Sequence, residues 1–169
     1  MSRGARSVWT SLRRVVGAGL VLGAVGVAPA AAQQSVSVDL PAVVGFVVAD
    51  VGSSTAGSTT TVSFADASLD PGKVLRVWVK ADAASFTPPA SGASSVAASK
   101  VSWSPAAAHN GIGSSGALSS VSWTLLFESD AGQTSGWAEI DWSLAALDGR
   151  VRAGNHQVSL RWKLEAVTP

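Results

Sequence analysis

The segment 156–169 alternates apolar and polar residues over almost its whole length. His156, Val158, Leu160, Trp162, Leu164 and Ala166 fall on one side, and Ser159, Arg161, Lys163 and Glu165 fall on the other. Because successive side chains of a strand point to opposite faces, this pattern predicts a strand with one buried face. The chain also has no cysteine, so a fold built around this strand is held by packing and hydrogen bonds without disulfides.

The first 32 residues have the pattern of a secretory signal peptide. Four arginines flank the start of an apolar stretch at 15–27, and the small residues of 28–32 offer a cleavage site before Gln33. A retained anchor helix is the alternative, but the apolar stretch is short and rich in glycine. We therefore expect a signal peptide at 1–32 of the general-secretion type, and one domain at 33–169 that is secreted or associated with the cell surface.

Cleavage of this signal would change the charge of the protein. The whole chain has 12 basic and 11 acidic residues, and Arg3, Arg6, Arg13 and Arg14 would leave with the signal. The remaining 8 basic and 11 acidic residues give a formal charge of −3. A mildly acidic protein without a basic run does not suit nucleic acid or an anionic lipid surface as partner. No membrane span is expected after cleavage.

The mature part is long enough for one domain with a core of its own. Small residues and valine dominate it, proline and glycine interrupt short apolar runs, and no long segment carries a helical stripe. Eight strands are predicted, at 35–40, 43–50, 60–64, 74–81, 101–104, 119–127, 137–144 and 156–167. This number and spacing predict an all-β fold, a single antiparallel β-sandwich of Ig-like or Greek-key type.

Two segments rich in small residues separate the predicted strands. One is 85–100, which contains Pro88-Pro89, and the other is 109–116. Long insertions in a sandwich lie at its ends, where binding loops are common. The plainer interpretation is exposed linker, because Ser, Ala and Gly offer little to hold a ligand.

Tryptophan is the aromatic residue that this chain favours, with six in the mature part and no tyrosine. Four of them share a strand face with aliphatic neighbours and are predicted to lie in the core: Trp103, Trp123, Trp142 and Trp162. Such a buried ring requires an acceptor for its indole N–H.

Trp78 and Trp137 fall on the opposite phase of their strands and are predicted to face outward. An exposed tryptophan can stack on the apolar face of a sugar or anchor a protein contact, so both are candidate ligand-binding residues. The alternative is that each ring lies flat on its own sheet, with Trp78 covered by the stems of Arg76 and Lys80.

Catalytic motifs are absent from the sequence. The mature part has two histidines, and the chain has no Gly-x-Ser-x-Gly, no His-Glu-x-x-His and no glycine-rich phosphate loop. Glu139 and Asp141 share one strand face, but they flank an outward tryptophan instead of lying on separate walls of a cleft. The acids of 128–136 fit no EF-hand pattern. We expect no enzyme activity, no metal and no cofactor.

A doubled Trp-x-Leu motif resembles that of the WxL-domain surface proteins of Gram-positive bacteria. In that family one motif lies in mid-domain and the second lies in a Tyr-x-x-x-Leu-Thr-Trp-x-Leu run followed shortly by proline. Here the distal run begins with histidine in place of the tyrosine and has arginine in place of the threonine, and Pro169 follows. The matching positions are Trp123, Leu125, Trp162 and Leu164.

The resemblance implies non-covalent attachment to peptidoglycan and display on the cell surface. The alternation of the strands, however, places the same four residues in the core. Their loss would then abolish wall binding by unfolding the domain and not by removing a contact.

More loosely, the chain resembles fimbrial and spore-coat-like subunits, which are secreted sandwiches with an extended first strand such as 35–40. Such subunits assemble when the first strand of one copy completes the sheet of the next. Two hypotheses follow. The protein is a non-catalytic envelope protein that binds peptidoglycan or another wall glycan, or it is a structural subunit that assembles with itself or with other surface proteins.

Overall fold

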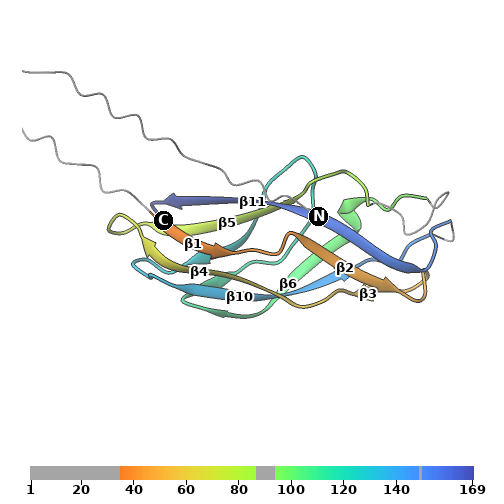
Figure 1. Ribbon diagram of the computed structural model, residues 1–169, viewed down its shortest axis with the longest axis horizontal. Helices are drawn as coiled ribbons and strands as arrows, with labels where there is room; N and C mark the ends of the chain where they lie inside the picture. The colour runs from red at the N-terminus through yellow and green to blue at the C-terminus, as the bar shows by residue number, and fades with distance from the viewer. Residues whose placement is uncertain (1–34, 87–93, 149) are drawn as a thin grey trace, which may run out of the picture. The chain divides into compact units, whose positions relative to one another are not determined.

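The computed structural model describes residues 35–86, 94–148 and 150–169 and shows an all-β protein (Figure 1). Its strands form two antiparallel sheets. Sheet A has the order β1 (Ser35–Asp39), β4 (Thr60–Ser68), β10 (Gly136–Leu144), β6 (Val101–His109) and β8 (Gly116–Ala117), and β3 (Thr55–Ala56) also pairs with β10. Sheet B has the order β2 (Val43–Val48), β11 (Gly154–Val167), β5 (Val74–Ala81), β9 (Thr124–Ser129) and β7 (Gly111–Gly113). The helical part of the described chain is one 3-10 turn, Ala98–Lys100.

The all-β prediction is confirmed, and each of the eight predicted segments overlaps a strand. The strand predicted at 74–81 has the same bounds in the structure, whereas the one predicted to end at Ser104 continues to His109. Three short strands, β3, β7 and β8, were not predicted, so the described residues form eleven strands. The predicted signal peptide at 1–32 lies outside the described residues. No described helix is long and apolar enough to cross a membrane.

Both sheets contribute side chains to one apolar cluster. On the inner face of sheet A, Trp103 and Trp142 are 3% and 2% exposed, and their ring centroids lie 5.6 Å apart. The Trp103 indole N–H donates to the Ser114 carbonyl at 2.7 Å, and that of Trp142 donates to the Thr60 hydroxyl at 2.8 Å. The predicted core position of these two rings is confirmed, and each has the acceptor that burial requires.

Trp162 and Leu164 of β11 are partly buried and pack against the same cluster from sheet B. The Trp162 indole N–H donates to the carbonyl of Pro41 at 2.7 Å. The distal Trp-x-Leu motif therefore supports the core, as its phase predicts.

The proximal motif lies on the other side of sheet B, so the prediction that Trp123 and Leu125 are core residues is wrong. A register shift in the β5·β9 pair sets Trp78 opposite Leu125 and Val77 opposite Phe127. Leu126 is the extra residue, and it is as fully buried as Phe127. Because side chains alternate with period two, one inserted residue moves everything before it to the opposite face.

The segment 109–116, interpreted from the sequence as a loop or linker, joins the two sheets. Its β7 pairs with β9 in sheet B, and its β8 pairs with β6 in sheet A. Glycine is required here because neighbouring side chains approach the backbone closely. A Cβ on Gly116 would lie 2.5 Å from Cζ2 of Trp103, and a Cβ on Gly113 would lie 2.5 Å from Cβ of Pro105. Small residues thus serve packing in this segment.

Residues 87–93 of the other predicted loop, 85–100, lie outside the described residues. Its described ends are ordered by contacts with each other, since Ser85 forms a β-bridge with Ala97 and Phe86 belongs to the core cluster.

Candidate functional site

The outer face of sheet A carries Trp137 between two short or flat neighbours. Trp137 of β10 lies opposite His109 of β6 and opposite Ser63 of β4. The His109 and Trp137 rings are stacked, with centroids 6.1 Å apart and planes 22° from parallel. His109 is exposed and Trp137 is half-buried. As predicted, Trp137 faces outward, and the structure adds an imidazole beside it.

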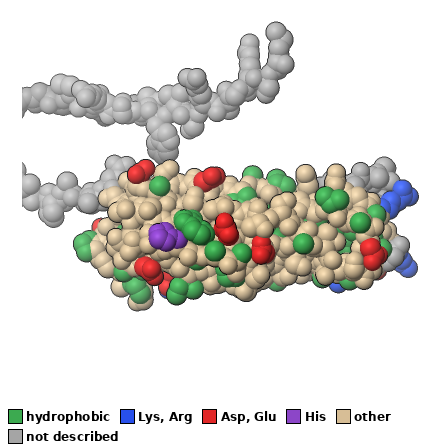
Figure 2. All heavy atoms as spheres, turned by 90° about the horizontal axis from the view of Figure 1, so that it is seen from below, with side chains coloured by type: hydrophobic (Ala, Val, Ile, Leu, Met, Phe, Trp, Pro, Cys, Tyr) green, Lys and Arg blue, Asp and Glu red, His purple; other side chains and the backbone are tan. Residues whose placement is uncertain are grey.

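Two carboxylates continue this face along β10. Glu139 and Asp141 are both exposed, and Asp141 accepts a hydrogen bond of 2.6 Å from the Thr59 hydroxyl. Glu139 lies between Thr61 and Ala107 and has no basic partner among the described residues. Figure 2 shows this side of the molecule, with acidic and hydrophobic side chains and a histidine along it and with Lys and Arg at one end.

The four side chains Trp137, His109, Glu139 and Asp141 together form what we call the acidic aromatic face. It combines flat rings with carboxylate oxygens that can accept hydrogen bonds from hydroxyl groups. Glu139 and Asp141 lie side by side on an open sheet surface, where a substrate bond cannot be enclosed between them. Glycoside hydrolysis needs two carboxyl groups on either side of the scissile bond, whereas these two lie along one strand.

The outer face of sheet B has a different character, which decides the role of Trp78. The Lys163 ammonium lies 4.9 Å from the centroid of the Trp78 ring, and the Lys80 ammonium lies 4.9 Å from that of Trp123. The Trp78 indole nitrogen is buried without a hydrogen-bond partner. The cation over Trp78 is therefore Lys163 of the neighbouring strand, and the Lys80 ammonium lies over Trp123 instead.

The remaining histidine is built into the core. His156 is 0% exposed, and its Nε2 lies 2.9 Å from the carbonyl oxygen of Arg152. The described residues contain no group of three or more side chains that could hold a metal ion.

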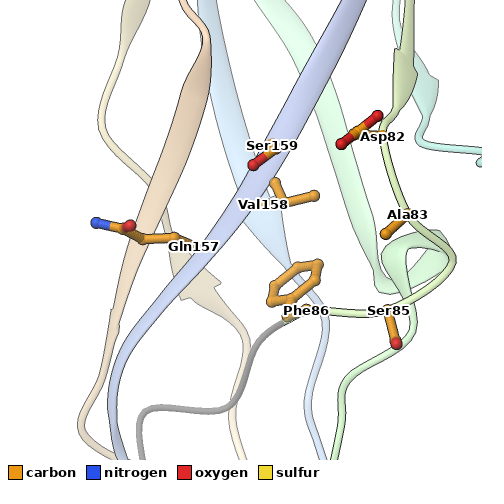
Figure 3. A pocket seen from close by; sticks show the side chains of 7 residues that line it. All are labelled: Asp82, Ala83, Ser85, Phe86, Gln157, Val158 and Ser159. Carbon is orange, nitrogen blue, oxygen red and sulfur yellow. The ribbon is translucent and has the colours of Figure 1, made fainter. Parts of the chain in front are cut away.

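A hollow of about 160 Å³ lies between β11 and the segment after β5 (Figure 3). Val158 points toward the ring of Phe86 there, whereas Gln157 points away from them. Asp82 at its rim is ion-paired with Arg161. Five of its seven lining residues are exposed and the hollow is small, so it is a shallow surface hollow below the usual size of a ligand pocket.

Comparison of the chain with protein-family models, with curated proteins and with solved structures finds no significant match.

Proposed function

We propose that this protein is a non-catalytic β-sandwich that is exported to the bacterial envelope and binds peptidoglycan or a related envelope glycan through the acidic aromatic face. The sandwich is supported by the single core cluster to which both sheets contribute. Export is supported by the signal-peptide pattern of 1–32. Absence of catalysis is supported by the engagement of both mature histidines, one in ring stacking and one in the core.

The observation that carries the proposal is the pairing of Trp137 with His109 beside Glu139 and Asp141. A sugar ring has apolar C–H faces, which pack on aromatic rings, and equatorial hydroxyls, which donate to carboxylates. An open sheet surface accepts a long polymer anywhere along its length, whereas a closed pocket would accept only a chain end.

The WxL resemblance points to the same class of ligand by a different route. In this proposal Trp162 and Leu164 maintain the fold, and the motif residues Trp123 and Leu125 lie on the face opposite to the glycan. Peptidoglycan attachment therefore depends on Trp137 and not on the motif itself.

Sedimentation of the purified full chain with insoluble peptidoglycan tests the proposal. We expect the protein to pellet with the glycan, and Trp137→Ala to weaken binding about tenfold, the effect of losing a contact of about 1.4 kcal/mol. Trp123→Ala is the matched control, because it removes the same residue type from the other face and should bind like the parent. A parent protein that stays in the supernatant, or a loss confined to Trp123→Ala, would contradict the proposal.

A second candidate function, self-assembly by strand exchange, is favoured by the position of β1. This strand lies at the edge of sheet A, pairs with β4 alone, and has a register shift between Ser35 and Ser37. An edge strand of this kind can be replaced by the same strand of another copy. Size-exclusion chromatography of the full chain and of a variant lacking 33–40 tests this. Assembly requires oligomers that disappear with the deletion, and monomers in both samples exclude it.

A further inference from the structure

The two halves of β11 pair with different strands, which lie on opposite sides of it. Residues 154–159 pair with β2, and residues 160–167 pair with β5. The two partners lie on opposite edges of β11, because the Leu160 N–H donates to the carbonyl of Ala42 while the Ser159 carbonyl accepts from the N–H of Asp82, each at 2.9 Å. The half of β11 that pairs with β5 therefore has a second edge, on the side where β2 has already ended.

Within the described residues, this second edge has main-chain groups without strand partners. Main-chain N–H and C=O groups of successive residues point to alternate edges, so those of Trp162, Leu164 and Ala166 point the same way as those of Leu160, away from β5. Among the described residues no main-chain hydrogen bond reaches these three positions from that side. We call residues 162–166 on this side the open edge.

Pro41 marks the point at which the edge becomes open. The β2·β11 ladder stops at the Leu160–Ala42 hydrogen bond, and Pro41 is the next residue back along the chain. The Pro41 carbonyl is instead bonded to the Trp162 indole. The chain before Pro41 forms β1, which pairs with β4 in sheet A and so leaves β11.

The space between β1 and the open edge is apolar. A hollow of about 120 Å³ lies there, lined by Val36, Leu69, Leu75, Leu164, Ala166 and Ser35. An unpaired strand edge beside an apolar hollow is a site where another strand can add.

The charges along β11 favour a second copy of this chain as the strand that adds to the open edge. Lys163 and Glu165 are two residues apart on the outer face, with their charged groups 3.0 Å apart. When two copies of this edge pair antiparallel with Leu164 opposite Leu164, Lys163 of each copy lies opposite Glu165 of the other. We propose that the open edge of β11 pairs in this register with the open edge of a second copy of this chain, which makes sheet B continuous across a twofold axis.

Such a dimer has a consequence for the outer face of sheet A. The twofold axis is perpendicular to the continuous sheet, so the acidic aromatic faces of both copies point to the same side. If they bind glycan as proposed above, one polymer engages both copies and is held by avidity. This consequence depends on the proposed function, whereas the dimer does not.

Sedimentation equilibrium of the full chain over about 1 µM to about 1 mM, a range that covers weak complexes, tests the dimer. We expect a monomer–dimer equilibrium with a dissociation constant inside this range. Lys163→Glu and Glu165→Lys each set like charges opposite each other twice, and each should raise the dissociation constant about tenfold. The double variant Lys163→Glu/Glu165→Lys restores both pairs and should return the constant to within about threefold of the parent value, the scatter of context-dependent pair energies.

Lys80→Glu is the matched control, because it changes the net charge as Lys163→Glu does but lies on β5, away from the open edge. It should leave the dissociation constant unchanged. A monomer at every concentration, or a dimer that all four variants leave equally stable, would overturn the proposal. Peptidoglycan pelleting by a monomeric variant would show that the proposed glycan site stands without the dimer.

Discussion

Each of the two outer faces of this molecule carries an outward-facing tryptophan, but the side chains next to the two rings differ. Trp137 of sheet A has His109 and Ser63 as cross-strand neighbours, and its ring stays half open beside two carboxylates. Trp78 of sheet B has Lys163 and Leu125 as cross-strand neighbours, and its ring is covered. Both tryptophans are half-buried, so the two faces differ in what lies against each ring: long side chains on sheet B, and short or flat ones on sheet A.

The largest effect that separates the faces is on stability. We expect Trp78→Ala to lower the free energy of unfolding by about 2–3 kcal/mol, because it removes a large ring that Lys163 and Leu125 pack against. Trp137→Ala should cost about 1 kcal/mol or less, since its cross-strand neighbours His109 and Ser63 are flat or short and lose little packing. Urea unfolding of both variants measures the difference, and equal losses would mean that the faces are not distinct.

A smaller difference in the free energy of unfolding is expected from the indole N–H groups of Trp142 and Trp78. Trp142→Phe removes the donor that bonds Thr60 in the core and should cost about 1–2 kcal/mol. Trp78→Phe removes a buried donor that has no partner, so its hydrogen-bond cost is absent and the net change should stay within about 0.5 kcal/mol. Urea midpoints that rank the two variants in the opposite order would contradict this account.

The smallest expected effects are those of replacing the side chains that lie against Trp78 and Trp137. Lys163→Ala should cost about 0.5–1 kcal/mol, the value of an exposed cation–π contact, and should make tryptophan fluorescence more accessible to acrylamide. His109→Ala should change the free energy of unfolding by less than about 0.5 kcal/mol, as expected for an exposed residue. Unchanged quenching in Lys163→Ala, measured where the protein is monomeric, would show that the lysine does not shield the ring.

Period-two alternation explains what could be predicted from the sequence. It located a strand in all eight predicted segments, the buried Trp103 and Trp142, and the outward Trp137. It failed at Trp123, because nothing in the local pattern marks Leu126 as an extra residue. Bulges depend on the partner strand, which the sequence of one strand does not reveal.

The candidate face was only half predictable for a related reason. The strand containing Trp103 was predicted to end at Ser104, directly before Pro105, and proline cannot donate in a central ladder. In the structure Pro105 lies at a register shift, where Ile140 pairs with Pro105 and Glu139 pairs with Ala107. The strand therefore continues past the proline and brings His109 beside Trp137. The short strands β7 and β8 were missed because their glycines serve close approach and carry no periodicity.

The central place of β11 in sheet B controls when this protein can fold. The Trp162 indole bonds to the carbonyl of Pro41, which lies 121 residues earlier in the chain. A polypeptide emerging from the ribosome cannot complete sheet B until β11 has been synthesised, and closure over so long a loop is slow. Sheet B, and with it the core cluster that both sheets share, can therefore form only after residues 154–167 have been made.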